Sequence, residues 1–502
     1  MLATSGAAAA QDASVVIHAD RPGPVVHRQI FGQFAEHLGH GIYDGIWVGP
    51  ASPIPNTQGF RNDVIAALRA IKVPVIRWPG GCFADEYHWR EGVGPAASRP
   101  TKVNTNWGGV TEPNTVGTHE FMTFAELVGA ETYVSGNVGS APPQEMADWV
   151  EYMTSPTAST LAGERRKNGR DAPWKVGYFG LGNELWGCGG NMRAEYAADV
   201  TKRYATFVKV PAGQKMLKIA SGATDDDTAW TEVMMREAGK LIDGIGVHHY
   251  TLPGDWTVKG PATGFDAAAW THTLARTWAM DDIVTRHSAV MDKYDPQRRV
   301  WLAVDEWGTW YDPTPGSNPG FLEQENTLRD AVIAALNINI FTAHAERVKL
   351  ANIAQMVNVL QAMIQTRGSA MVLTPTYHVF HMYLPWQDAT RLPVEVAAGR
   401  IGTGKDSLPQ LSSSAVRGTD GRLHVALVNT DPEHALPVSL RIDGAGVSRA
   451  AVQQLTAARM DARNTFAQPA ALAPRDLPSV RASGGRIAIT LPAKSVTVLE
   501  LR

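Results

Sequence analysis

The stretch "VGYFGLGNE" at residues 176–184 contains the pattern that decides the fold. Its first part is apolar on both faces, and Asn183 and Glu184 follow where the apolar run stops. A run of this kind is typical of a parallel strand that is covered on both sides by helices. Polar side chains directly after it are candidates for function, because catalytic groups of such folds lie at the carboxyl ends of the strands.

The same pattern recurs through the first three quarters of the chain. The further runs are "HRQIFGQF" (27–34), "VPVIRWPG" (73–80), "ETYVSGNVG" (131–139), "LKIASGAT" (217–224), "DGIGVHHY" (243–250), "VWLAVDEW" (300–307) and "RVKLANIAQ" (347–355). Amphipathic stretches such as "RNDVIAALRAI" separate them. These strand–helix units predict an α/β fold, a (β/α)₈ barrel over residues 29–384. A doubly wound open sheet is the alternative, but no Gly-x-Gly-x-x-Gly turn follows a strand.

The pattern of apolar and polar residues changes from residue 385. Stretches such as "LSSSAVRGTDGRLHVALVNTD" and "GGRIAITLPAKSVTVLELR" alternate apolar and polar residues and are broken by Gly, Asp and Pro. They predict an antiparallel β-sandwich over residues 385–502. The early stretch "ASVVIHAD" (13–20) is also strand-like, and we expect residues 14–28 to contribute a strand to that sandwich.

Residues 1–13 are rich in alanine and resemble the end of a trimmed signal peptide. We therefore expect a periplasmic or secreted protein, with the cytoplasm as the alternative location. The chain has 502 residues and a net charge of −3, which gives no electrostatic reason to expect a nucleic acid or an anionic membrane as partner. No apolar run reaches the ~18 residues of a membrane span.

Unusual polar residues stand where the predicted strands end. They are Glu36 and His37 after the first strand, Arg77 at the second, Asn183 and Glu184 at the fourth, His248 to Tyr250 at the sixth, Glu306 at the seventh and Gln355 at the eighth. Because these ends meet at one rim of a barrel, we expect one site there.

The two glutamates at this rim suggest a reaction. Hydrolysis of a glycosidic bond with retention needs a carboxyl group that protonates the leaving oxygen and a second one, about 5–5.5 Å away, that attacks the anomeric carbon. Strands four and seven face each other across a barrel, so Glu184 and Glu306 are suited to these tasks. Asn183 is placed to bond a sugar hydroxyl, Arg77 to keep Glu306 ionised, and Tyr250 to orient it.

Less specific interpretations exist for each residue alone. A glutamate at a strand end is often an ion-pair or capping partner. The tandem His248–His249 is more often structural than metal-binding, and two cysteines without a histidine pattern make a poor metal site. We therefore expect no metal and no cofactor. The prediction that Glu184 and Glu306 form one catalytic site depends on the combination of "GNE" with "DEW".

At this point the sequence resembles the glycoside hydrolase family 51 α-L-arabinofuranosidases, from about residue 14 to the C-terminus. The matching stretches are "FGQFAEHLGHGIYDGIWVG", "RWPGGCFADEYHWREGVGP", "LGNELWG", "DEWGTWY" and "RVKLANIAQMVNVLQAMI". The resemblance implies a barrel with a C-terminal sandwich and a retaining double displacement. Carried over by position, Glu184 resembles the acid/base and Glu306 the nucleophile.

The resemblance also assigns the residues around the two glutamates. Arg77 resembles the support of the nucleophile, with His248 as a further supporting residue, and Trp107 resembles a wall of the aglycone side. The residues that resemble holders of the terminal furanose are Glu36, Asn183, Tyr250 and Gln355.

The sequence departs from the family pattern at Cys82, where many members have an asparagine that contacts the sugar. A thiol is a poor hydrogen-bond donor, so this substrate contact is expected to be weaker or to pass to the backbone. Our hypothesis is that Cys82 forms a disulfide with Cys188, which needs a Cα separation below ~7 Å. Two separate buried thiols are the alternative.

The activity that the resemblance implies is exo-acting removal of terminal α-L-arabinofuranosyl units from arabinan, arabinoxylan or their oligosaccharides. A hydrolase of the same family acting on a galactofuranoside, a xyloside or a β-glucan is one alternative, and a non-catalytic carbohydrate-binding barrel is another. The family also implies a homo-oligomer, with a hexamer as the candidate assembly.

Overall fold

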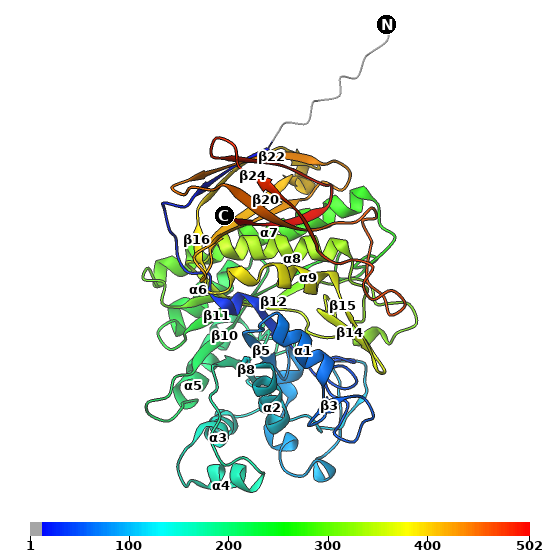
Figure 1. The fold of residues 1–502 in the computed structure, drawn as a ribbon. Helices are drawn as coiled ribbons and strands as arrows, with labels where there is room; N and C mark the ends of the chain where they lie inside the picture. Colours follow the sequence, from blue (N-terminus) through cyan, green and yellow to red (C-terminus); the bar gives the residue numbers. More distant parts are fainter. Residues whose placement is uncertain (1–12) are drawn as a thin grey trace.

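A closed barrel of eight parallel strands forms the centre of the molecule (Figure 1). The computed structural model describes residues 13–502. In chain order the barrel strands are β2 (Gly32–Phe34), β5 (Val75–Trp78), β8 (Glu131–Gly136), β9 (Tyr178–Leu181), β10 (Leu217–Thr224), β11 (Gly244–Thr251), β12 (Trp301–Thr309) and β13 (Val348–Ile353). Each strand pairs with the next, and β13 closes on β2. The predicted (β/α)₈ barrel is confirmed.

Helices cover the outside of the barrel. They are α1 (Asn62–Ala70), α2 (Thr118–Val128), α3 (Pro143–Thr154), α4 (Thr160–Lys167), α5 (Ala194–Phe207), α6 (Thr228–Ala238), α7 (Ala267–Tyr294), α8 (Leu328–Ala343) and α9 (Pro375–Met382). Because the helices pack on one face of the strands and the barrel interior covers the other, β12 is buried over nearly its whole length.

Three barrel strands, β2, β9 and β13, stop before the polar residues that the sequence analysis places at their ends, whereas β5, β11 and β12 contain theirs. β9 ends at Leu181, so Asn183 and Glu184 lie in the loop beyond it. The first predicted strand, 27–34, is wrong at its start, since Arg28–Phe31 form a 3₁₀ turn before the short strand β2. Gly32 fits β2 closely: a Cβ atom there would lie 2.2 Å from Oδ1 of Asn352.

The C-terminal domain is a two-sheet β-sandwich. One sheet has the order β17 (Val394–Ala397), β1 (Ala13–His18), β22 (Leu436–Asp443) and β25 (Arg486–Leu491). The other has the order β16 (Thr390–Leu392), β20 (Leu411–Arg417), β21 (Leu423–Asn429), β26 (Ser495–Leu501), β23 (Arg449–Leu455) and β24 (Arg475–Arg481). The N-terminal strand therefore does join the sandwich, where it runs antiparallel to β17 but parallel to β22.

Helix α8 lies between the barrel and the sandwich (Figure 1). It contacts β12 on one side and β20, β21 and β26 on the other, which explains why Leu328 to Thr342 are all buried. A capping box formed by Thr327 and Asp330 satisfies its first backbone N–H groups inside this dry interface. The two domains thus share one continuous apolar layer, and this layer holds the barrel strand that carries Glu306.

The domain limits 14–28, 29–384 and 385–502 remain predictions. Strand β1 already begins at Ala13, and the rest of the predicted leader lies outside the described residues. Within residues 13–502, no helix has the length and apolar character needed to cross a membrane.

Candidate active site

A pocket of about 430 Å³ opens at the carboxyl ends of the barrel strands. Its lining brings together nine of the residues singled out in the sequence, which are Glu36, Cys82, Trp107, Asn183, Glu184, His248, Tyr250, Glu306 and Gln355. Arg77 lies beneath them and contacts Glu306. The strand-end argument therefore identified residues of one common site, although they are spread over more than 300 residues of sequence.

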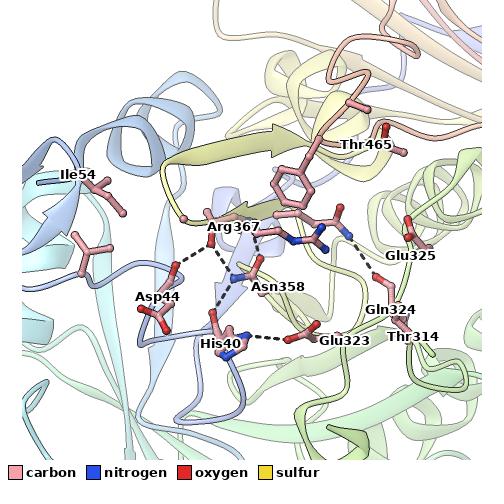
Figure 2. Close-up of a pocket in the computed structure, with 16 residues that line it drawn as sticks. His40, Asp44, Ile54, Thr314, Glu323, Gln324, Glu325, Asn358, Arg367 and Thr465 are labelled. Carbon is pink, nitrogen blue, oxygen red and sulfur yellow. Dashed lines mark hydrogen bonds and ion pairs between the residues drawn. The ribbon is translucent and has the colours of Figure 1, made fainter. Parts of the chain in front are cut away.

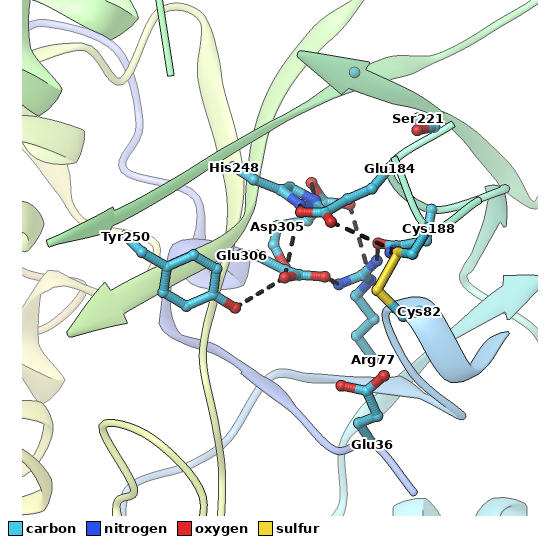
Figure 3. Close-up of polar contacts among 12 residues, drawn as sticks. Glu36, Arg77, Cys82, Glu184, Cys188, Ser221, His248, Tyr250, Asp305 and Glu306 are labelled. Atoms are coloured by element: carbon cyan, nitrogen blue, oxygen red, sulfur yellow. Dashed lines mark hydrogen bonds and ion pairs between the residues drawn. A yellow bond between two sulfur atoms is a disulfide. The ribbon is translucent and has the colours of Figure 1, made fainter. Parts of the chain in front are cut away.

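The carboxyl groups of Glu184 and Glu306 face each other in this pocket (Figure 3). One oxygen of each and one ring nitrogen of His248 all lie within 4.8 Å of one another. Strand pairing explains part of this closeness, because His248 on β11 stands opposite Glu306 on β12. The separation is close to that of two carboxyl groups that act on one anomeric carbon without an intervening water.

Glu306 is held by two donors. Nη1 of Arg77 lies 2.6 Å from Oε1, and the hydroxyl of Tyr250 donates to Oε2 over 2.8 Å. The backbone of Gly81 also comes close: a Cβ atom there would lie 3.0 Å from Oε1. Charge-assisted hydrogen bonds of this kind fix the orientation of a buried carboxylate and stabilise its ionised form.

Arg77 organises the floor of the site. Its Nη2 donates to Oδ1 of Asn183 over 2.7 Å, and its guanidinium lies over the ring of Phe34 at 4.6 Å. Burial alone would lower the pKa of Arg77, but Glu306 and Asp305 raise it above its ordinary value. One permanently charged side chain thus positions both a candidate nucleophile and a candidate sugar ligand.

His248 lies among three carboxylates. Nδ1 is 2.9 Å from Glu184 and 3.6 Å from Glu306, and Nε2 is 3.3 Å from Asp305. Burial works against the charged ring, yet Glu306, Asp305 and Glu184 together raise the pKa of His248 to about 10. The imidazolium therefore provides a second positive charge in the site, next to that of the Arg77 guanidinium.

Asp305 balances these two cations from below. The hydroxyl of Tyr133 donates to its Oδ2 over 2.7 Å, and Arg77 and His248 lie close to it. Burial alone would raise the pKa of Asp305, but the neighbouring cations hold it below its ordinary value. The sequence analysis passed over this residue, since the aspartate of "VDEW" precedes the strand end.

Glu36, Gln355 and Trp107 form a connected group on the wall made by the loops after β2, β13 and β5. Oε1 of Glu36 accepts the indole N–H of Trp107 at 2.9 Å, and Oε2 accepts the amide of Gln355 at 3.1 Å. Burial first, and the Glu306 carboxylate second, raise the pKa of Glu36 to about 7. Trp107, expected on the aglycone side, is thus joined to a residue expected to hold the furanose.

Aromatic side chains that the sequence analysis missed line the pocket mouth. Trp256 is 55% exposed and packs edge to face on Trp310, with ring centroids 5.4 Å apart. Trp310 packs in the same way on Tyr250 at 5.1 Å. Tryptophans in loops carry no periodic signal, so only the folded loops after β11 and β12 reveal this wall.

Cys82 and Cys188 are bonded to each other in the structure, with Cα atoms 5.5 Å apart. The bond connects the loop after β5 with the loop after β9 (Figure 3). Their sulfurs are therefore not thiolates that could bind a metal. The cluster of Glu184, His248 and Glu306 has metal-ligand spacing, but its donor atoms already pair with one another and with Arg77.

A second and larger cavity, of about 780 Å³, lies between the loops after β2, β12 and β13 and a loop of the sandwich (Figure 2). His40 pairs with Glu323 at 2.9 Å in it, and Arg367 lies over the ring of Phe466. None of the site residues predicted from the sequence lines it. It provides no pair of facing carboxylates comparable to Glu184 and Glu306, so the chemistry belongs to the smaller pocket.

A barrel with two facing carboxyl groups at its mouth defines a glycoside hydrolase, and comparisons with known proteins agree. Residues 67–266 match the family description "Alpha-L-arabinofuranosidase 1 domain", and residues 305–495 match "Alpha-L-arabinofuranosidase C-terminal domain". The chain is 46% identical to an "Intracellular exo-alpha-L-arabinofuranosidase" of Bacteroides ovatus over 503 residues, which cover 100% of this chain and 98% of the relative.

Solved structures give the same result. A GH51 arabinofuranosidase from Xanthomonas axonopodis pv. citri is 59% identical, with a TM-score of 0.97 over 98% of this chain and 100% of that one. An α-L-arabinofuranosidase from Thermotoga maritima, solved as an arabinose complex, is 30% identical, with a TM-score of 0.86 over 97% and 99% of the two chains. The protein belongs to the glycoside hydrolase family 51 α-L-arabinofuranosidases.

Proposed function

We propose that this enzyme removes terminal α-L-arabinofuranosyl units from arabinan, arabinoxylan or their oligosaccharides, with retention of configuration at the anomeric carbon. The observation that carries the proposal is the approach of the Glu184 and Glu306 carboxylates to within 4.8 Å. Inverting enzymes need a water between their carboxyl groups and keep them ~6.5–9.5 Å apart. The relatives named as arabinofuranosidases support the choice of sugar.

In the first step Glu306 attacks the anomeric carbon while protonated Glu184 gives its proton to the leaving oxygen. The glycosidic bond breaks, and an arabinofuranosyl ester of Glu306 forms. In the second step Glu184, now a carboxylate, takes a proton from water as the water oxygen attacks the same carbon. Glu306 leaves, and both side chains return to their starting states.

The neighbouring side chains have distinct tasks in this scheme. Arg77 and Tyr250 hold Glu306 in line for attack, and the hydrogen bond between His248 and Glu184 orients the carboxyl group of Glu184. We assign the hydroxyls of the furanose to Glu36, Asn183 and Gln355, which line the pocket and carry carboxylate or amide groups that bond hydroxyls. The relative named an exo-α-L-arabinofuranosidase supports an exo mode, in which the pocket takes one terminal unit.

The site separates the two ends of the substrate. Trp107 and Glu36 lie on the furanose side, so we move the aglycone wall to Trp256 and Trp310 at the mouth. Aromatic faces stack on sugar rings and tolerate several linkages.

A panel of nitrophenyl glycosides tests the choice of sugar. The α-L-arabinofuranoside should have the highest kcat/KM, ahead of the β-D-galactofuranoside, β-D-xyloside and β-D-glucoside. Fastest turnover of a pyranoside would overturn the assignment. Binding of arabino-oligosaccharides without any release of arabinose would instead indicate a carbohydrate-binding protein.

Two variants test the roles of the glutamates. Glu306→Ala should lose nearly all activity on every leaving group, because the substitution removes the proposed nucleophile. Glu184→Ala should still turn over substrates whose leaving group needs no proton, and azide should restore its second step. Equal loss on all substrates without an azide effect would show that Glu184 is not the acid.

The cellular location rests on two observations. The relative from Bacteroides ovatus is named intracellular, which gives the expected export no support and favours the cytoplasmic alternative. The Cys82–Cys188 disulfide favours an oxidising compartment. Fractionation of the source cells decides between these two locations.

The oligomeric state is a separate proposal. We propose that the protein is a homo-oligomer, with a hexamer as the expected species, and sedimentation velocity is the test.

A further inference from the structure

The 3₁₀ turn after strand β5, η2 (Cys82–Glu86), is attached at two points to the loop that carries Glu184. We call this loop, residues 183–189, the Glu184 turn. One attachment is the hydrogen bond that Asp85 accepts from the N–H of Asn183, and the other is the disulfide made by Cys82. The two attachment points, Asn183 and Cys188, lie on either side of Glu184 in the sequence.

Both carboxylate oxygens of Asp85 accept hydrogen bonds from backbone N–H groups. Oδ2 accepts the N–H of Asn183 at 2.7 Å, and Oδ1 accepts the N–H groups of Val138 and Gly139 at 2.7 and 2.8 Å. The side chain is 3% exposed and does not line the pocket. Asp85 therefore joins the loops after β5, β8 and β9 without touching the space where substrate binds.

The disulfide limits the other side of Glu184. Sγ of Cys188 lies 3.7 Å from Oε2 of Glu184. A sulfur in a disulfide carries no proton, so this approach is a van der Waals contact that restricts the carboxylate rather than a hydrogen bond to it. With His248 bonded to the other oxygen at 2.9 Å, the Glu184 carboxyl group is confined between two neighbours.

The backbone of the turn shows why such attachments are needed. Glu184 has φ of +41°, in the left-handed region that residues with a Cβ atom rarely adopt. The turn is also tightly closed, because the N–H groups of Gly187 and Gly189 both bond to the Glu184 carbonyl. A Cβ atom on Gly189 would lie 2.0 Å from the carbonyl oxygen of Asn183. A conformation of this kind persists when its surroundings fix it.

We propose that Asp85 is a positioning residue for Glu184, and that the Cys82–Cys188 disulfide acts with it to hold the Glu184 turn in its left-handed conformation. The proposal rests on the proposed role of Glu184 as acid/base. Its consequence is that loosening either attachment misplaces the proton donor more than it disturbs the bonds of Arg77 and Tyr250 to Glu306. Proton donation then suffers more than nucleophilic attack.

The test compares two leaving groups in Asp85→Asn. Phenyl α-L-arabinofuranoside needs a proton on its leaving oxygen, and the 2,4-dinitrophenyl compound does not. We expect kcat/KM to fall by about 10²-fold on the phenyl compound, since small displacements of a catalytic group have effects of this size. On the dinitrophenyl compound the fall should be much smaller, so that the ratio of the two kcat/KM values decreases. The Cys82→Ala/Cys188→Ala double variant should lower this ratio as well, to a smaller extent.

Chemical reduction of the disulfide tests the same role in the folded wild-type enzyme, without any substitution. Dithiothreitol is oxidised to its cyclic disulfide as Cys82 and Cys188 each take up an electron and a proton. The folded wild-type enzyme should then lose activity on the phenyl substrate preferentially. The same reagent should leave the double alanine variant unchanged. An unaltered ratio of the two activities in the reduced wild type would overturn the role of the disulfide.

Asp431→Asn is the matched control. Asp431 is a buried aspartate of the sandwich, and it also accepts backbone N–H groups, those of Glu433 and His434. Its substitution should lower the melting temperature without changing the ratio of the two activities. Equal loss on both substrates in Asp85→Asn would overturn the inference. If Glu184→Ala itself shows no dependence on the leaving group, the proposed function fails as well; if only Asp85→Asn shows none, the inference alone fails.

Discussion

The hydroxyl of Tyr250 lies 2.8 Å from Oε2 of Glu306 and donates a hydrogen bond to it. Arg77 donates a hydrogen bond to the other oxygen, Oε1, so one donor fixes each oxygen of the carboxylate. The arrangement leaves the nucleophile with a single orientation, directed at the space below Glu184. Its value for the reaction follows from geometry, because a carboxylate that rotates freely spends little time in line with the anomeric carbon.

Tyr250→Phe removes this donor and keeps the ring. A hydrogen bond to a charged group contributes about 1.5–3 kcal/mol, so we expect kcat/KM to fall roughly 10–10²-fold. The loss should occur in the burst phase that reports attack by Glu306, measured with an activated aryl arabinofuranoside. Tyr87→Phe is the control, since the buried hydroxyl of Tyr87 has no hydrogen-bond partner among residues 13–502. Equal effects of the two substitutions would contradict the assignment.

Glu36→Gln should change how stability depends on pH. The pKa of Glu36 is raised from 4.5 to about 7 by folding, so the folded protein binds more protons than the unfolded chain in this range. The contribution to stability is present below about pH 4.5 and is lost as the pH rises through about 7, in total about 3 kcal/mol. The melting temperature of the wild type should therefore decrease more between pH 5 and pH 8 than that of Glu36→Gln.

Parallel melting curves for the two proteins over this pH range would contradict the prediction for Glu36. Glu164→Gln on helix α4, far from the pocket, is the control and should reproduce the slope of the wild type. The comparison isolates the buried carboxyl group, because both substitutions remove one acidic group and keep its shape.

Trp256→Ala tests the aromatic wall at the pocket mouth. Loss of ring stacking costs about 1–1.5 kcal/mol, and we expect kcat/KM on arabinotriose to fall roughly tenfold. Methyl α-L-arabinofuranoside has no second ring, and its turnover should change little. Tyr196→Ala on helix α5, where Tyr196 is 56% exposed, is the control for loss of an exposed aromatic side chain. A uniform loss on both substrates in Trp256→Ala would remove it from the aglycone side.

The sequence allowed the two glutamates to be predicted because strand periodicity marks where each barrel strand ends. The same argument reached Arg77 and Tyr250, since strand ends of a barrel meet at one rim. Asp85 was out of reach: its partner is a backbone N–H 98 residues away, and no side-chain pattern records such a contact. The disulfide was a hypothesis on two cysteines that follow the second and fourth predicted strands, and only the fold brings their Cα atoms to 5.5 Å.

The conformation of the long loops is the second feature that the sequence did not predict. Trp256 and Trp310 gave no signal in the sequence, because the conformation of a long loop depends on contacts that local propensity does not encode. The hydrogen bond from the indole N–H of Trp107 to Glu36 could not be predicted for the same reason, and our proposal to place Trp107 on the furanose side depends on it. Strand β2 was predicted too long because "HRQI" has strand-like composition, although its backbone forms a 3₁₀ turn.

The most direct test of the account is to identify the residue that becomes covalently linked to the sugar. Glu184→Ala, mixed with 2,4-dinitrophenyl α-L-arabinofuranoside and quenched in acid, should accumulate an arabinofuranosyl ester, because the second step lacks its base. Peptide mass spectrometry should place that ester on Glu306. A label on any other residue, or a first product with inverted configuration, would contradict the pairing of Glu184 and Glu306 across one anomeric carbon.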